Sequence, residues 1–328
     1  MTEPPLRLGT RGSPLALAQA KSVAKQLGEA EIMTIKTAGD HPYETGGSSA
    51  SPAEPPRIYD KARFVREIEG ALLAGEIDLA VHSAKDLPTE LPDGLAIAGV
   101  PAREDARDAY IGGVSSLGKV PEGSRIGTSS LRRRAQILAL RPDLEIVEVR
   151  GNVDTRLAKL ESGEFDGLVL AAAGMHRLGR AEQISFVLEL EELIPSPGQG
   201  ALAIEALHAK DRPVTAAESI TDRGALGTLS AERSLVAALD ATCNTPLGAH
   251  ATLERGGRMR LRAFCGLQDG SEWLRDELEM DASEPEALGR VLAERMRSAG
   301  ATDILARAEE MADMRGRSAG EAEERPVS

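Results

Sequence analysis

The feature that most constrains the fold is a pattern that occurs twice along the chain. Residues 7–20, RLGTRGSPLALAQA, and 125–138, RIGTSSLRRRAQIL, each predict a short strand, a Gly-Thr turn and a helix. Farther along, residues 71–83, ALLAGEIDLAVHS, and 158–171, AKLESGEFDGLVLA, each predict a helix end, a Gly-Glu turn and an apolar strand. Because both patterns occur in the same order, we expect two related α/β lobes, each with a mostly parallel sheet.

After about residue 220 the pattern changes to that of a small α+β domain. Residues 227–240 predict an amphipathic helix, and AHATLER, MRLRAFCGL and EWLRDELEMD predict three antiparallel strands joined by turns. A closing helix is expected over residues 284–300. The final stretch, RGRSAGEAEERPVS, has no apolar pattern and predicts disorder. The expected fold class is therefore α/β, with two lobes and a C-terminal α+β domain that contains a three-stranded antiparallel sheet.

Composition narrows the classes of function. A net charge of −13 with 2% aromatic residues disfavours nucleic acid as a partner, which would select a basic surface and stacking rings. The longest apolar run, near residues 167–174, is too short to span a membrane. The N-terminal residues lack the pattern of a signal peptide, and the chain has two cysteines, so we expect a cytoplasmic protein. Neither these cysteines nor the five histidines have metal-site spacing, and no metal is predicted.

The two cysteines differ in their surroundings. Cys265 alternates with Leu261, Ala263 and Leu267 on one face of a predicted strand, so we interpret it as a buried small hydrophobe. Cys243 lies in a polar turn, LDATCNTPLGAH, which is compatible with an incidental surface cysteine or with a reactive one.

Two turns at predicted helix starts are candidate anion sites. Residues 10–13 and 128–130 bring hydroxyls and backbone N–H groups together, with Ser13 as a candidate N-cap. Arginines cluster at LRRRAQ and RGNVDTR in an otherwise acidic chain, which favours a small anionic ligand. If the lobes face each other, these basic turns converge on one cleft.

Polar residues follow the predicted strand in IDLAVHSAKDLP, residues 77–88. Side chains at the carboxyl end of such a strand lie where α/β proteins bind ligands. Asp86 is therefore a candidate general acid or base, or the counter-ion of a cation, although without further context an ion pair with Lys85 or a turn before Pro88 is slightly favoured. His82 is interpreted as a packing or capping residue.

Taken together, these stretches resemble the porphobilinogen deaminase family, also called hydroxymethylbilane synthases, of tetrapyrrole and heme biosynthesis. The matching stretches run in family order from about residue 6 to residue 307: RLGTRGSPLALAQA, GEIDLAVHSAKDLP, GTSSLRRRAQ, VRGNVDTRLAKL, LAAAGMHRLG, PSPGQGALAIE and ATCNTPLGAH.

The resemblance implies a domain organisation. It implies two lobes like those of type 2 periplasmic binding proteins, with a chain that returns to the first lobe near residue 198, and a C-terminal cofactor-carrying domain. The expected boundaries are 1–101 with 198–219 for the first lobe, 102–197 for the second, 220–308 for the C-terminal domain, and 309–328 for a disordered tail.

The resemblance also implies an activity. The enzyme would be a transferase that condenses four porphobilinogen molecules head to tail, with loss of ammonia, to give hydroxymethylbilane. A dipyrromethane cofactor would be held through a thioether at Cys243. The expected state is a monomer, with porphobilinogen as a small-molecule substrate.

Roles for individual residues follow from the resemblance in the same way. Asp86 would be catalytic, stabilising positive charge near the pyrrole nitrogens and moving protons. The groups that bind cofactor and substrate carboxylates would be Arg11, Ser13, Lys85, Thr128, Ser129, Arg132, Arg133, Arg150, Arg156 and Arg177. Lys61 and Phe64 match residues that follow the mobile loop of the family.

Three alternatives stay open from the sequence. The loop at 40–61 departs from the Gly-Gly-Lys-Gly-Leu-Phe run of the family, so a catalytically impaired bilobal anion-binding relative is the main alternative. A binding module without chemistry would explain the lobes and arginines but not Cys243 and Asp86. An ordinary cysteine hydrolase would use Cys243 with His250, and replacement of His250 would then abolish activity.

Overall fold

The computed structural model describes residues 4–28, 30–37, 65–242 and 245–323, with side chains described as far as residue 314. The chain forms two compact units. The first comprises residues 1–106, 171–183 and 198–230, and the second comprises residues 107–170, 184–197 and 231–328.

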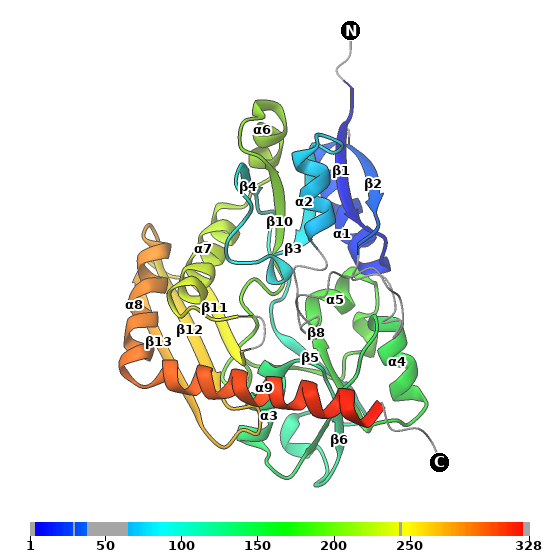
Figure 1. Ribbon diagram of the computed structural model, residues 1–328, viewed down its shortest axis with the longest axis vertical. Helices are drawn as coiled ribbons and strands as arrows, with labels where there is room; N and C mark the ends of the chain where they lie inside the picture. The colour runs from blue at the N-terminus through cyan, green and yellow to red at the C-terminus, as the bar shows by residue number, and fades with distance from the viewer. Residues whose placement is uncertain (1–3, 29, 38–64, 243–244, 324–328) are drawn as a thin grey trace. The chain divides into compact units, whose positions relative to one another are not determined.

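The first unit is built on a five-stranded sheet in the order β2-β1-β3-β10-β4 (Figure 1). Its strands are β1 (Leu6–Arg11), β2 (Ala30–Ile35), β3 (Leu79–Ser83), β4 (Leu95–Gly99) and β10 (Leu202–Leu207). β1 pairs in parallel with β2 and β3, whereas β10 is antiparallel to both of its neighbours. β4 therefore runs in the same direction as β3, and only β10 opposes the others.

The helices of the first unit lie between and around these strands in sequence. They are α1 (Pro14–Leu27), α2 (Arg66–Leu73), α5 (Ala172–Arg177), α6 (Asp211–Ser219) and the first half of α7 (Arg223–Ala238), with short helices η3 (Ala84–Asp86) and η5 (Ala181–Gln183). Ser13 caps α1 as predicted, since its side chain accepts a hydrogen bond from the Ala16 amide and Pro14 occupies the first turn.

The second unit contains a sheet with an equivalent strand order, β7-β6-β8-β5-β9. Its strands are β5 (Asp108–Gly112), β6 (Arg125–Gly127), β7 (Glu145–Val147), β8 (Gly167–Ala171) and β9 (Phe186–Leu188), and its helices are η4 (Leu117–Lys119), α3 (Leu131–Leu140) and α4 (Val153–Glu161). β6 pairs in parallel with β7 and β8, as β1 does with β2 and β3. The prediction of two related, mostly parallel α/β sheets is thus confirmed.

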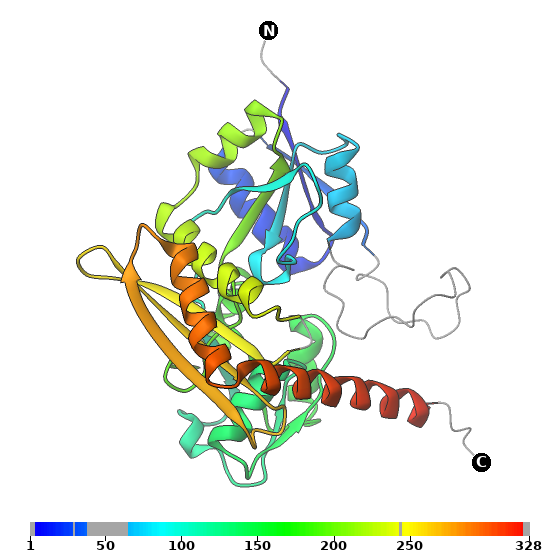
Figure 2. The same cartoon turned by 60° about the vertical axis from the view of Figure 1, so that its left-hand side comes forward.

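The second unit also contains the predicted three-stranded antiparallel sheet, in the order β11-β12-β13. Its elements are β11 (Leu247–Glu254), β12 (Arg258–Gly266), β13 (Trp273–Asp281), α8 (Pro285–Ser298) and α9 (Ala301–Glu323). Aliphatic residues of α7, α8 and α9 form one core with β11 and β12, and Figure 2 shows α8 lying across the strands.

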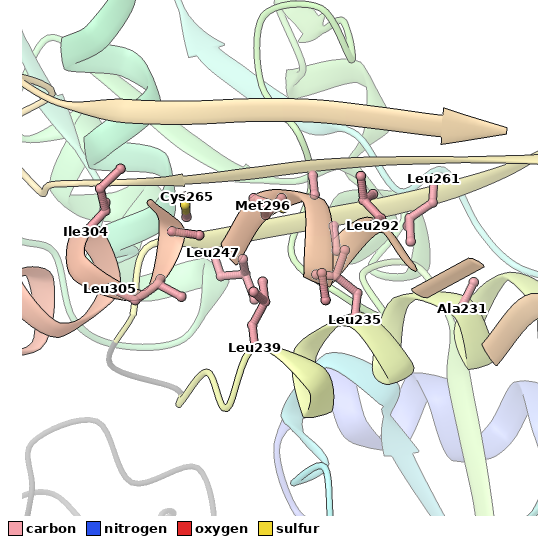
Figure 3. Packing of buried hydrophobic residues seen from close by; sticks show 14 of the residues in the cluster. Ala231, Leu235, Leu239, Leu247, Leu261, Cys265, Leu292, Met296, Ile304 and Leu305 are labelled. Carbon is pink, nitrogen blue, oxygen red and sulfur yellow. The ribbon is translucent and has the colours of Figure 1, made fainter. Parts of the chain in front are cut away.

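Cys265 belongs to this core, as its strand position predicted. It is fully buried among aliphatic side chains, including Leu247 and Ile304 (Figure 3). Burial raises the pKa of the thiol to about 12. Such a thiol stays protonated and unreactive at neutral pH.

The expectation of a disordered tail from residue 309 is wrong for most of that stretch. Helix α9 continues to Glu323. Early in α9, Ala308 belongs to the core beneath the three-stranded sheet, and Met311 packs against that core. Residues 324–328 lie outside the described residues, and the predicted domain boundaries stay predictions.

Within the described ranges, no helix combines the length and the apolar character needed to cross a bilayer.

Close contact between α7 and α8 yields a test of this packing. A Cβ at Gly289 would lie 2.5 Å from the Ala231 carbonyl oxygen and 2.8 Å from the Leu235 nitrogen. We expect Gly289→Ala to lower the free energy of unfolding by about 1–3 kcal/mol, because two backbones must separate. Urea unfolding of the two proteins measures the difference.

The matched control is Gly70, which is also in a helix but is exposed, with nothing within 4 Å of the place that a Cβ would occupy. Gly70→Ala should leave stability unchanged or raise it by about 0.5–1 kcal/mol. Equal effects of the two substitutions would contradict the packing argument.

Candidate active site

In the first unit, two predicted site segments lie at the same edge of the sheet. Arg11 ends β1, and η3, which contains Lys85 and Asp86, directly follows β3. β1 and β3 are parallel neighbours, so their carboxyl ends meet. Ser13, at the start of α1, lies at this edge as well. Lys85 and Asp86 are both partly exposed, as groups that meet a ligand must be.

Residues 198–201 hold η3 in place. Gly198 has a φ of +73°, and a Cβ there would lie 2.8 Å from the carbonyl carbon of Ala84 and 2.9 Å from the nitrogen of Lys85. The Ala84 amide donates a 3.0 Å hydrogen bond to the Ala201 carbonyl. Only glycine combines this conformation with so close an approach.

The same loop contacts Arg177 at the end of α5. The guanidinium Nη2 of Arg177 donates a 2.7 Å hydrogen bond to the Gly200 carbonyl, and burial lowers the pKa of this arginine. Nearby, Nδ1 of His176 lies 3.0 Å from Oε1 of Glu104. Residues 198–200 therefore link Arg177 to the segment that contains Asp86.

In the second unit, the predicted hydroxyl turn begins α3. Ser130, rather than Thr128 or Ser129, is the N-cap, since its side chain accepts from the Arg133 amide at 3.4 Å. Thr128 is buried and its Oγ1 accepts from the Ser130 amide at 3.2 Å, whereas Ser129 is partly exposed. The turn orders the amides at a helix N-terminus, where anions are favoured.

Arg132 and Arg133 share a single buried carboxylate. Nη1 of Arg132 lies 2.7 Å from Oδ2 of Asp108, and Nη2 of Arg133 lies 2.8 Å from Oδ1. Asp108 is fully buried, and the arginines are 5% and 6% exposed. Burial lowers the pKa of Arg133, an effect that Asp108 opposes. Two guanidinium groups against one carboxylate leave one excess positive charge in a desolvated place.

Arg156 adds to this positive region, whereas Arg150 lies in a different environment. Burial, followed by the charge of Arg133, lowers the pKa of Arg156 to about 10, and its Nε donates to the Gly151 carbonyl at 2.8 Å. Arg150 is exposed and pairs with Glu148 at 2.9 Å. Of the two predicted arginines, Arg156 is thus the one near the buried pair.

The segment Ile194–Pro195 joins α3 to the three-stranded sheet. The Ile194 carbonyl accepts hydrogen bonds from Arg132 at 2.8 Å and from Gln136 at 2.9 Å. The next carbonyl, of Pro195, accepts from the Ala249 amide in β11 at 2.9 Å. Arg132 and β11 are therefore connected through two consecutive residues.

Cys243, Lys61 and Phe64 lie outside the described residues. The residues on either side of Cys243 are anchored, because Leu239 and Leu247 enter the same core (Figure 3). The Thr245 hydroxyl also donates to the Thr242 carbonyl at 2.7 Å. The described residues on both sides of the cysteine loop are thus held by packing and hydrogen bonding.

His250, the partner in the hydrolase alternative, has a different contact. It is 8% exposed, and its Nδ1 lies 3.3 Å from Oε1 of the fully buried Glu232. Glu232 also accepts from the Ala251 amide at 2.8 Å. The contacts of His250 are those of a packed structural residue.

Sequence reasoning missed Asp108, the carboxylate beneath the arginine pair. Its signal was an acidic residue at the first position of the buried strand DAYIG. It also missed the linking role of Ile194, for which an apolar residue gives no signal. In the described part of the chain, no group of three or more His, Cys, Asp or Glu residues could hold a metal.

Comparison with solved structures gives weak likenesses. An arginine-specific periplasmic binding protein from Salmonella typhimurium is 12% identical with a TM-score of 0.38, and the match covers 68% of this chain and 94% of that one.

Comparison with family models and curated proteins is more specific. The model described as porphobilinogen deaminase, dipyromethane cofactor binding domain, matches residues 6–215, and the model of the porphobilinogen deaminase C-terminal domain matches residues 226–298. Porphobilinogen deaminase of Thermus thermophilus is 46% identical, and that of Deinococcus radiodurans 44%; each match covers 91% of this chain and 97% of the relative. The chain belongs to the porphobilinogen deaminase family.

Proposed function

We propose that this chain condenses four porphobilinogen molecules head to tail, with loss of four ammonia molecules, and releases hydroxymethylbilane by hydrolysis. The reaction takes place on a dipyrromethane cofactor, which we assign to Cys243. The observation that carries the proposal is that both porphobilinogen deaminase domains match and together span most of the chain. It follows that the enzyme is a transferase of tetrapyrrole biosynthesis.

The described residues fit a cofactor that carries acetate and propionate groups. Arg132 and Arg133 leave one positive charge that Asp108 does not balance. Arg156 lies close enough for the charge of Arg133 to lower its pKa. A carboxylate at this place would balance the excess charge. We assign cofactor binding to these arginines with Thr128, Ser129 and Arg150. When bound, the cofactor supplies the free pyrrole carbon to which the first substrate is joined.

Residues of the first unit are assigned to substrate. Arg11, Ser13 and Lys85 lie at the edge where β1 and β3 end, and Arg177 is linked to it through residues 198–200. Each can bind a carboxylate. Asp86 accepts hydrogen bonds from pyrrole N–H groups and stabilises the positive charge that develops as ammonia leaves. Lys61 and Phe64 are assigned to the edge of the site by family resemblance alone.

Further assignments concern the state of the protein. We propose a cytoplasmic monomer that binds neither nucleic acid nor membrane. A net charge of −13 supports the exclusion of nucleic acid. The impaired anion-binding alternative depends on residues 40–61, outside the described residues, and the assays below separate it from an active enzyme.

The role of Asp86 is tested by Asp86→Asn. We expect the variant to fold and to bind porphobilinogen but to lose turnover by about 10²- to 10⁴-fold, because the amide supplies neither the charge nor the proton transfer. Hydroxymethylbilane formation is measured at saturating porphobilinogen. Asp93→Asn is the matched control, since Asp93 is exposed in the following loop, and it should retain full turnover. Turnover of Asp86→Asn near that of the parent would refute the assignment.

The two cysteines provide a matched test of cofactor attachment. We expect the intact mass of the purified protein to exceed that of the chain by two linked pyrrole units, and Cys243→Ala to lose the excess. Cys265→Ala should keep it, because that thiol is buried and protonated. An excess mass retained in Cys243→Ala would move the attachment point elsewhere. An unmodified parent that stays inactive with added porphobilinogen or hydroxymethylbilane would favour the impaired alternative.

A further inference from the structure

Three ionisable side chains meet inside the first unit, away from the assigned ligand groups. His82 comes from β3, Glu205 from the neighbouring strand β10, and Glu69 from α2. Their exposed fractions are 5%, 0% and 6%. Groups of this kind are rarely buried unless they are paired. Sequence patterns alone indicate only a packing or capping role for His82.

The geometry shows which groups pair. Nε2 of His82 lies 3.2 Å from Oε2 of Glu205. Among the described residues, none makes a hydrogen bond of good geometry with Nε2 of His82, with either carboxylate oxygen of Glu205 or with Oε1 of Glu69, so the 3.2 Å approach of His82 to Glu205 is a close polar contact. The printed ion-pair contact of Glu205 is therefore the one with His82 on the neighbouring strand.

The pKa of Glu69 responds to the other two members of the cluster. Burial, followed by the charge of Glu205, raises the pKa of Glu69, whereas His82 and Arg66 act in the opposite direction. The raised pKa favours the neutral form of Glu69 beside Glu205. The charged or titratable groups that face Glu69 are thus His82 on β3, Glu205 on β10 and Arg66 on its own helix.

The cluster lies directly before the segment that contains Asp86. His82 pairs with Ala203 and Ser83 with Leu202, and the Ala84 amide then bonds to the Ala201 carbonyl. Ala84 begins η3, so the ladder between β3 and β10 ends where η3 starts. An attraction between His82 and Glu205 across these two strands fixes their register at that end.

We propose that His82 is a positioning residue, which through its contact with Glu205 holds the end of β3 so that Lys85 and Asp86 in η3 face the substrate. This inference rests on the proposed function, because it assigns His82 a role through Asp86. Small displacements of a catalytic group reduce rates strongly, even when the altered residue never meets the substrate.

The test uses the cofactor-loaded full chain with His82→Leu and His82→Gln. We expect His82→Leu to lower kcat at least tenfold, with KM for porphobilinogen changed less than twofold. His82→Gln, whose amide keeps a polar group able to contact Glu205, should restore kcat to within about threefold of the parent. Intact mass establishes that each variant carries its cofactor.

Val23→Ala is the control for lost stability alone. Val23 is fully buried in α1 and packs on the same sheet, so its truncation lowers the thermal midpoint without touching η3. We expect its kcat to match that of the parent. A kcat for folded His82→Leu within twofold of the parent, or equal losses in His82→Leu and His82→Gln, would overturn the proposal.

Hydrogen exchange gives a readout that does not depend on activity. We expect the amide hydrogens of the peptide spanning residues 83–87 to exchange faster in His82→Leu than in Val23→Ala, because the Ala84 amide loses protection. If His82→Leu yields no folded protein, Glu205→Gln tests the same contact from the other side. Exchange and kcat equal to those of the parent would then overturn the inference. If the parent is inactive, the proposed function fails, and if Asp86→Asn is fully active, the role assigned to Asp86 fails. In both cases the exchange result still reports on His82.

Discussion

The hydrogen-bonded pairing of β3 with β10 is the constraint on which the first unit depends. β10 is the only strand of its sheet that runs against the others, and it lies between β3 and β4, which precede it by more than 100 residues. Its amino end fixes where β3 stops, and the glycine-rich loop before it contacts both η3 and Arg177. Because one returning strand positions all of these segments, the candidate catalytic carboxylate depends on a long-range contact rather than on local sequence.

In the second unit the corresponding constraint is electrostatic. Burying Arg132 and Arg133 costs several kcal/mol per ion, and Asp108 offsets only part of this cost. The carbonyl acceptors at Val169 and Ile194 provide further partners without further charge. The remaining positive charge can pair with an anion. The residues that lower the stability of the ligand-free protein therefore favour carboxylate binding. A site of this kind exchanges stability of the free protein for affinity.

Much of the fold could be predicted because its signals are local. The repeated strand–turn–helix segments, the alternation around Cys265 and the Ser13 cap each depend on neighbours in sequence, and the structure confirms them. Asp108, Glu205 and the extension of α9 were not predicted, because each becomes meaningful only through a contact with residues far along the chain. The arginines could be listed but not ranked, since the burial that separates Arg156 from Arg150 is set by tertiary packing.

The cysteine loop shows how these constraints combine within the second unit. Leu239 and Leu247, on either side of the loop, share one core, and β11 leaves the loop toward the carbonyl of Pro195. The preceding carbonyl, of Ile194, accepts from Arg132. Ile194 and Pro195 therefore contact both an arginine assigned to the cofactor carboxylates and the strand that follows the cysteine loop. Contacts inside the second unit therefore hold the described flanks of the cysteine loop and Arg132 to the same stretch of backbone.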